Sequence, residues 1–334
     1  MILRGRVRAR PRAYLGRNRM KVYVYAICKN ESRFVENWMS SMAEADNVYV
    51  LDVGSEDESA WRLKNAGAVV KTEKVIPWRF DEARNMSLEM VPKDADICVC
   101  TDICETFNAG WREKLEASWK NGATRAICKY IIGFDKEANE DKTAFFDRIH
   151  AREGFVWARP AYEKLVLSQG APPETRVYAD GVTLYRREKR PKPHGEFVSL
   201  LEAYVREDPH DAEGVFYLGR EYMYCGKWDM CIKTMIRHLS MPGVVWPGER
   251  CASMLCIARA YEEKGDAGNA QKWFLRAAAE GVHLSEPHRE LARFLSKQGE
   301  LYGAIYFKRR ARLLNESAEA VKTGLNSKAW GIIF

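Results

Sequence analysis

The sequence predicts two domains: an α/β domain in which helices cover both faces of a doubly wound parallel sheet, then an all-α domain. The length of 334 residues suggests two domains. Strand and helix patterns alternate over the first part, and helical periodicity replaces them after residue 193. We therefore expect a basic extension at 1–19, an α/β domain at 20–193, helical repeats at 194–314 and a tail at 315–334.

Buried strands and amphipathic helices alternate in the first domain. Apolar runs predict strands at residues 22–28, 47–51, 68–71, 96–101, 125–134 and 144–149. Helices are expected near residues 34–42, from an N-cap at Ser55 to Gly67, and at 78–90 and 111–120. Four strand–helix alternations within about 85 residues are typical of a parallel sheet.

Three glycines mark a repeat in the second domain. Gly226, Gly265 and Gly299 are separated by 39 and 34 residues. Each has a large apolar residue four positions before it and a small residue five positions after it: Tyr222, Tyr261 and Leu295, then Cys231, Ala270 and Ala304. This spacing predicts tetratricopeptide repeats, which stack into a solenoid.

Composition excludes several classes of protein. No apolar run is long enough to span a membrane, and no apolar segment follows the N-terminal arginines as in a secretory signal, which favours the cytoplasm. The nine cysteines show no paired zinc pattern, so reduced core thiols are expected. The seven arginines in residues 1–19 indicate either a disordered tail or an arm for nucleic acid or an anionic membrane. No nucleic-acid motif accompanies them, and a nucleic-acid partner is not expected.

Acidic residues follow two of the predicted strands. Asp52 ends the second strand, and Asp102 and Glu105 follow the fourth. Ligands of open α/β sheets bind beyond the carboxyl ends of the strands, and a carboxylate buried there without a role only costs desolvation. These three side chains are therefore the first candidates for a binding site.

Four segments in this order resemble the family 2 glycosyltransferases of the GT-A fold. They are residues 26–31 (AICKNE), 51–57 (LDVGSED), 84–85 (RN) and 101–105 (TDICE). The chain is also similar to the bacterial and phage members that carry tetratricopeptide repeats behind the catalytic domain. The matching positions are residues 150–152, Trp157, 160–163 and 220–222. The resemblance covers residues 20 to about 314.

This resemblance implies transfer of a hexose from a nucleotide-sugar, expected to be a UDP-sugar, to an unknown glycan, lipid or protein acceptor with inversion. It implies that Asp52 accepts hydrogen bonds from the base or ribose and that Asn30 and Glu31 line the base pocket. Arg84 would approach the nucleotide. Asp102 would be the first acid of the family's DxD motif, facing the diphosphate where negative charge grows.

The sequence departs from the family pattern at the expected metal site. Cys104 replaces the second Asp of the motif, Tyr162 replaces a His, and Arg186 lies near the position of a further His. Thiolate is a soft ligand that suits Mg or Mn poorly. A divalent cation is therefore a doubtful cofactor.

Two explanations for these departures stay open. In the first, Asp102 holds the metal ion, and Glu105 or His194 rebuilds a site of hard ligands. In the second, the metal is absent or weakly held, and the basic run at residues 186–192 neutralises the diphosphate or is only a solvated linker.

The catalytic base and the function itself each have an alternative. Glu163 is the candidate that deprotonates the acceptor hydroxyl, with Asp135 and Asp147 as other candidates. The alternative function is a catalytically degenerate GT-A domain, with the helical repeats acting as a scaffold that binds a protein partner.

Overall fold

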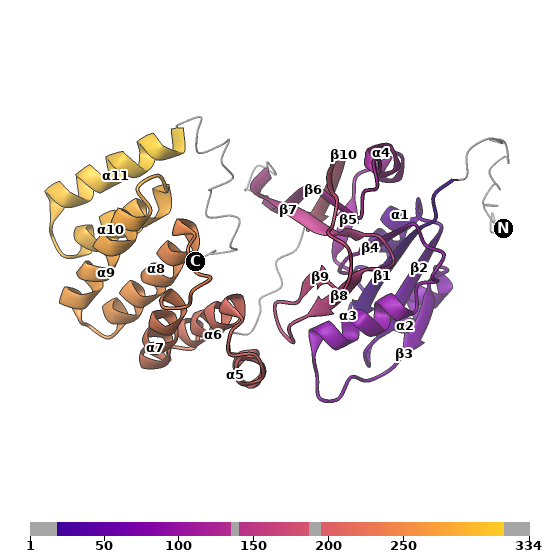
Figure 1. Ribbon diagram of the computed structural model, residues 1–334, viewed down its shortest axis with the longest axis horizontal. Helices are drawn as coiled ribbons and strands as arrows, with labels where there is room; N and C mark the ends of the chain where they lie inside the picture. The colour runs from indigo at the N-terminus through magenta and orange to yellow at the C-terminus, as the bar shows by residue number, and fades with distance from the viewer. Residues whose placement is uncertain (1–18, 135–139, 187–194, 317–334) are drawn as a thin grey trace, which may run out of the picture.

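The computed structural model describes residues 19–134, 140–186 and 195–316. An α/β part runs from Met20 to Arg186, and a helical part runs from Gly195 to Glu316 (Figure 1). The expectations for residues 1–18, Asp135, the basic run at 187–192, His194 and the tail from 317 lie outside the described residues.

The α/β part contains one large mixed sheet and a small hairpin. The large sheet has the order β3-β2-β1-β4-β7-β6-β10-β5, and the hairpin pairs β8 with β9. The strands are β1 (Val22–Cys28), β2 (Asn47–Asp52), β3 (Val69–Thr72), β4 (Ile97–Cys100), β5 (Glu105–Phe107), β6 (Arg125–Phe134), β7 (Glu140–His150), β8 (Phe155–Ala158), β9 (Lys164–Leu167) and β10 (Arg176–Arg186).

The prediction of a parallel sheet holds only for its first half. Strands β3, β2, β1 and β4 are parallel, whereas β7 pairs antiparallel with both β4 and β6. β10 is parallel to β6, and β5 is antiparallel to β10. The sheet becomes mixed because β6 and β7 form a hairpin, which needs no helical crossover.

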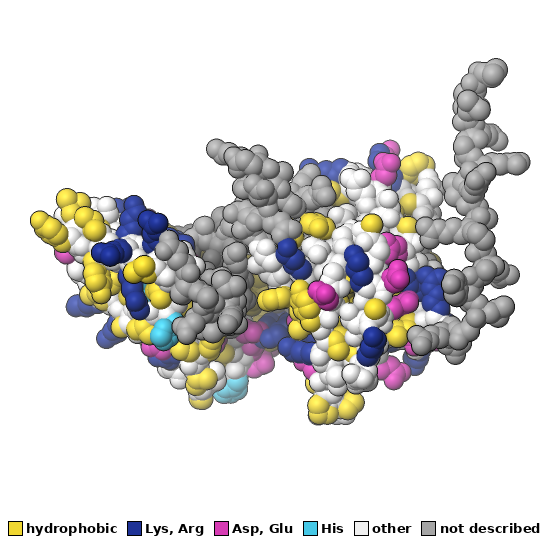
Figure 2. Space-filling view, turned by 90° about the horizontal axis from the view of Figure 1, so that it is seen from above, with side chains coloured by type: hydrophobic (Ala, Val, Ile, Leu, Met, Phe, Trp, Pro, Cys, Tyr) yellow, Lys and Arg dark blue, Asp and Glu magenta, His cyan; other side chains and the backbone are white. Residues whose placement is uncertain are grey.

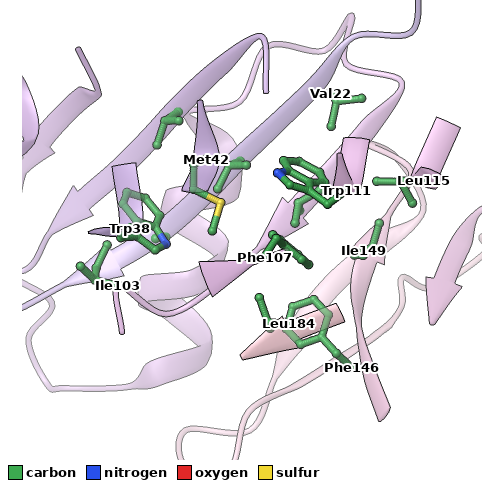
Figure 3. Packing of buried hydrophobic residues seen from close by; sticks show 14 of the residues in the cluster. Val22, Trp38, Met42, Ile103, Phe107, Trp111, Leu115, Phe146, Ile149 and Leu184 are labelled. Carbon is green, nitrogen blue, oxygen red and sulfur yellow. The ribbon is translucent and has the colours of Figure 1, made fainter. Parts of the chain in front are cut away.

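Helices cover both faces of the parallel half. The helices are α1 (Val35–Met42), α2 (Ser59–Asn65), α3 (Phe80–Glu89) and α4 (Trp111–Ser118). Trp38 and Met42 of α1 pack with Trp111 and Leu115 of α4 on one face (Figure 3). Leu88 of α3 packs on the other face. The strands between these layers are apolar on both sides, as parallel strands require.

Seven helices follow between residues 195 and 316, and the last six of them form three hairpins. They are α5 (Val198–Glu207), α6 (Ala212–Tyr224), α7 (Trp228–Leu239), α8 (Pro247–Glu263), α9 (Ala267–Glu280), α10 (Ser285–Lys297) and α11 (Leu301–Glu316). Gly226, Gly265 and Gly299 join the helices of each hairpin with positive φ angles, which glycine adopts without strain. Cys231, Ala270 and Ala304 are buried at the helix crossings, as in tetratricopeptide-like repeats.

A polar and aromatic junction joins the two parts. Arg159 Nε donates to Asp211 Oδ2 at 2.5 Å, and the other oxygen of Asp211 accepts from the backbone N–H of Glu213 as the N-cap of α6. The ring of Tyr162 stacks on that of Tyr217, with centroids 4.4 Å apart. The first helical hairpin is therefore held directly by the loop between β8 and β9.

None of the described helices combines the length and the apolar character needed to cross a lipid bilayer.

Candidate functional site

Asp52 and Asp102 lie at the same edge of the sheet, on either side of β1. Asp52 ends β2 level with Cys28, and Asp102 follows β4, whose Cys100 lies level with Tyr25. Two strand spacings separate them, which amounts to roughly 10 Å. The parallel half of the sheet therefore brings the two predicted aspartates to one edge.

Three arginines bind the carboxylate of Asp102. Oδ1 accepts from Arg84 Nη2 and, at 3.4 Å, from Arg148 Nη1, and Oδ2 accepts from Arg186 Nη2 at 2.5 Å. The arginines come from α3, β7 and β10. Both oxygens of this predicted metal ligand are therefore engaged by protein donors.

Glu105 is held in the same way and is fully buried. Arg148 Nη2 lies 3.0 Å from both of its carboxylate oxygens, and the hydroxyl of Tyr130 donates to Oε1. The backbone N–H of Asp102 donates to Oε2 at 2.8 Å. Hydrogen bonds of this kind to a charged group satisfy it well inside a protein.

Glu163 joins the cluster through Arg84. Its Oε1 lies 3.3 Å from Arg84 Nε and 3.2 Å from Arg84 Nη2. The Arg84 side chain is almost fully buried, and its Nη1 reaches the carbonyl of Thr101 at 3.4 Å. We call the six side chains Asp102, Glu105, Glu163, Arg84, Arg148 and Arg186 the ionic cluster. Its three carboxylates balance its three guanidinium groups.

The ionic cluster keeps its central carboxylate charged. Burial alone would raise the pKa of Asp102, but the positive charges of Arg84, Arg148 and Arg186 hold it well below 3.8. Asp102 is therefore ionised at neutral pH and compensated entirely by protein side chains.

Asp52 has a different environment. It is 1% exposed, and its Oδ1 accepts from the backbone N–H groups of Gly54 and Ser55 at 3.1 and 3.0 Å. Its Oδ2 is buried and has no hydrogen-bond partner. A buried carboxylate oxygen without a partner is costly and uncommon.

Asn30 and Glu31 tie the end of β1 to the loop after Asp52. Asn30 has a positive φ of 55°, its side-chain oxygen accepts from the Glu56 N–H at 2.7 Å, and its own N–H donates to Ser55 Oγ. The Glu31 N–H donates to Ser59 Oγ at 2.7 Å. The prediction that Ser55 caps a helix is wrong, because α2 begins at Ser59 and Ser55 binds Asn30 instead.

The residues expected to hold a metal ion do not fit one. Within residues 19–134, 140–186 and 195–316, no group of three or more His, Cys, Asp or Glu side chains could hold a metal. Burial raises the pKa of Cys104, so that its thiol stays protonated, and the side chain lines a surface cavity of about 550 Å³ between α1 and residues 103–109. The hydroxyl of Tyr162 donates to Glu221 of α6.

Sequence reasoning missed Arg148 and Tyr130. Both lie on the hairpin of β6 and β7, which the sequence placed only as strand-like segments. The one available signal was the charged pair of Asp147 and Arg148 between Phe146 and Ile149 in a strand-like segment. Asp147, an alternative base, points to Arg125 at 3.3 Å.

Comparisons with known proteins give no family for this chain. No family model matches, and no curated protein matches. Among solved structures, "MamA MSR-1 C2" is 19% identical with a TM-score of 0.30 and covers 36% of this chain. "Crystal structure of MamA" is 14% identical with a TM-score of 0.32 and covers 37%. The match spans about two thirds of those chains (66% and 69%), and likenesses this weak carry no argument about function.

These findings correct the sequence analysis. No glycosyltransferase family model matches, and the structural matches reported are to MamA. The identification of this chain as a family 2 glycosyltransferase is therefore wrong. The roles that the resemblance gave to Asn30, Glu31, Asp52, Arg84 and Asp102 lose that support, as do those given to Glu105 and Glu163.

Proposed function

We propose that this protein is a protein-interaction scaffold, in which the helical repeats bind a partner and the α/β domain is a rigid base. One observation carries the proposal: Asp102, the most exposed acid of the candidate site, is bound by three arginines. Stacked helical hairpins supply the extended surface on which repeat proteins bind their partners.

The charge balance of the ionic cluster argues against metal-dependent transfer. A divalent ion at Asp102 and Glu105 would have to displace Arg148, which binds both acids. It would also leave Arg84 buried beside a cation. Separating a buried guanidinium from its carboxylate costs several kcal/mol.

Calorimetry tests the proposal. We expect no heat of binding when UDP or UDP-sugars are titrated into the protein at millimolar concentration, with or without Mn²⁺. Saturable binding of UDP would overturn the scaffold function. The helical domain needs no nucleotide, so its melting temperature should also be unchanged by UDP.

One observation favours a second candidate, the binding of a nucleotide-sugar and transfer of its hexose. Asp52 Oδ2 is a buried acceptor without a donor at the ligand-binding edge of the sheet. An N–H or O–H group of a nucleotide could supply that donor, and the arginines of the ionic cluster could face its diphosphate without a metal. In the calorimetry above, UDP binding that is lost in Asp52→Ala and unaffected by EDTA would support this candidate.

A further inference from the structure

The last described helix exposes a group of large apolar side chains. In α11, Leu301, Tyr302, Ile305 and Tyr306 are 62%, 93%, 65% and 64% exposed. Their spacing of one and four residues places them together over the first two helical turns. Single exposed apolar residues are ordinary, but four adjacent ones mark an interaction site.

The earlier hairpins indicate what packs on this face. Ile232 lies six positions after Gly226 and is 8% exposed, whereas Ile305 lies six positions after Gly299 and is 65% exposed. Phe274, nine positions after Gly265, is fully buried and packs on Phe294 of α10. The helix positions of Ile305 and Lys308 are thus covered in an earlier hairpin and open in α11, whereas the positions of Tyr302 and Tyr306 face outward in every hairpin.

The second half of this face is basic. Lys308 lies at the position equivalent to Phe274 and is exposed, as is the adjacent Arg309. Neither makes an ion pair with another described residue, and the described side chains of α11 include no acid. In Figure 2, apolar side chains gather at the outer end of the helical domain, and Lys and Arg side chains lie beside them.

We propose that this face of α11 binds an amphipathic helix of a partner protein, one that carries an apolar stripe flanked by acidic residues. The inference rests on the proposed function and names its surface. A helix suits the face because helices occupy the equivalent faces of the earlier repeats. Acidic residues on the partner would pair with Lys308 and Arg309.

Other occupants fit the charges less well. A second copy of the chain, paired about a two-fold axis through the apolar half, would leave Lys308 and Arg309 of both copies without an acidic partner. Residues 317–334 contain two lysines and one glutamate, so that segment has no acidic excess. An anionic lipid surface would attract Lys308 and Arg309, but it would not occupy the position that a helix fills in the preceding hairpins.

A designed peptide tests the proposal. The probe is a fluorescent peptide of about five helical turns, with leucines on one face and glutamates beside them, titrated into the full chain. We expect saturable binding in fluorescence anisotropy. A peptide of the same composition in scrambled order, or with lysine in place of glutamate, should bind at least about tenfold more weakly.

Matched variants locate the binding surface. Ile305→Asp should weaken binding about tenfold, and Tyr302→Ala, at a 93% exposed position where folding is not at risk, should weaken it as well. Leu275→Asp on α9, at a 45% exposed position, is the control and should change affinity by less than about twofold. Lys308→Glu should shift the preference toward the lysine peptide.

Several results would overturn the proposal. They are equal binding of the ordered and scrambled peptides, competition by vesicles of phosphatidylserine and phosphatidylcholine, competition by a peptide of residues 317–334, and a dimer that Ile305→Asp dissociates. Peptide binding lost in Leu275→Asp but kept in Ile305→Asp would overturn this surface and leave the scaffold function standing. UDP binding in calorimetry, by contrast, counts against the scaffold function itself.

Discussion

The carboxylates at the ends of β2 and β4 are stabilised in different ways. Each places an aspartate at the carboxyl edge of the sheet. At the end of β4, Asp102 is compensated by three guanidinium groups from elements distant in the sequence. At the end of β2, Asp52 is held by two N–H groups of its own turn and keeps one oxygen without a partner.

The two acids should therefore contribute to the free energy of unfolding by different amounts. The charge of Asp102 is coupled to α3, β7 and β10, so its removal affects contacts across the whole sheet. Asp52 acts within residues 52–55, so its removal affects a single turn. Four measurements test whether the two acids differ in this way.

Replacing Asp102 with alanine should have the largest effect. The change leaves three arginines with two carboxylates, and buried Arg84 loses one of its two acidic partners. We expect the free energy of unfolding in urea to fall by about 3 kcal/mol. Asp94→Asn, which removes an exposed ion pair with Lys21, is the control and should cost less than about 1 kcal/mol. Equal losses in the two variants would mean that the ionic cluster is not coupled.

The second largest effect should come from lowering the pH, which removes the contribution of Asp102 to the free energy of unfolding. Because the folded pKa of Asp102 lies well below 3.8, its stabilisation is complete above the unfolded pKa of about 3.9 and is lost as the pH falls from there toward the folded pKa. Between about pH 4 and pH 2, the unfolding free energy of the wild type should therefore fall more steeply than that of Asp102→Asn. Parallel curves would contradict the depressed pKa.

Replacing Asp52 with alanine should have a smaller effect. The change removes two hydrogen bonds to the Gly54 and Ser55 N–H groups, but it also removes a buried oxygen that has no partner. These effects oppose each other, and we expect a loss of about 1 kcal/mol in urea denaturation. A loss as large as that of Asp102→Ala would show that the turn is coupled to the sheet as strongly as the ionic cluster is.

Gly54→Ala tests the same turn through its backbone. Gly54 has a φ of 103°, which an alanine adopts with strain, and an added Cβ would lie 3.4 Å from Lys74 Cε at the far end of a flexible side chain. We expect a loss of at least about 1 kcal/mol, close to that of Asp52→Ala. Urea denaturation beside Asp52→Ala measures it, and an unchanged midpoint would mean that the turn relaxes freely.

The sequence predicted local features well and long-range ones poorly. The bounds of β1 and the glycines of the three hairpins followed from apolar periodicity and helix-ending signals. The positions of Asp52 and Asp102 at one edge followed from the rule for parallel strands. Local patterns carry this information because each depends on residues within one turn or one strand.

The ion pairs of the ionic cluster could not be predicted, because its arginines come from three separate elements, α3, β7 and β10. Arg148 reaches Asp102 only because β7 pairs antiparallel with β4, and periodicity does not specify strand pairing. The departures at Cys104 and Tyr162 are visible in the sequence, but the environments of these side chains are not. Burial raises the pKa of the Cys104 thiol, and the Tyr162 hydroxyl donates to Glu221. Asp102 and Glu105, which the motif placed at a metal site, are paired with arginines instead.

Asp211 has a consequence for how the chain unfolds. The Asp211 carboxylate both caps the N-terminus of α6 and binds Arg159 of the α/β domain, so the start of the first hairpin is tied to the sheet. Separating the domains would take the Arg159 guanidinium away from Asp211 and open the stack of Tyr162 on Tyr217. Mechanical pulling or proteolysis should therefore detach the distal hairpins first, while α6 and the sheet persist together as one cooperative unit.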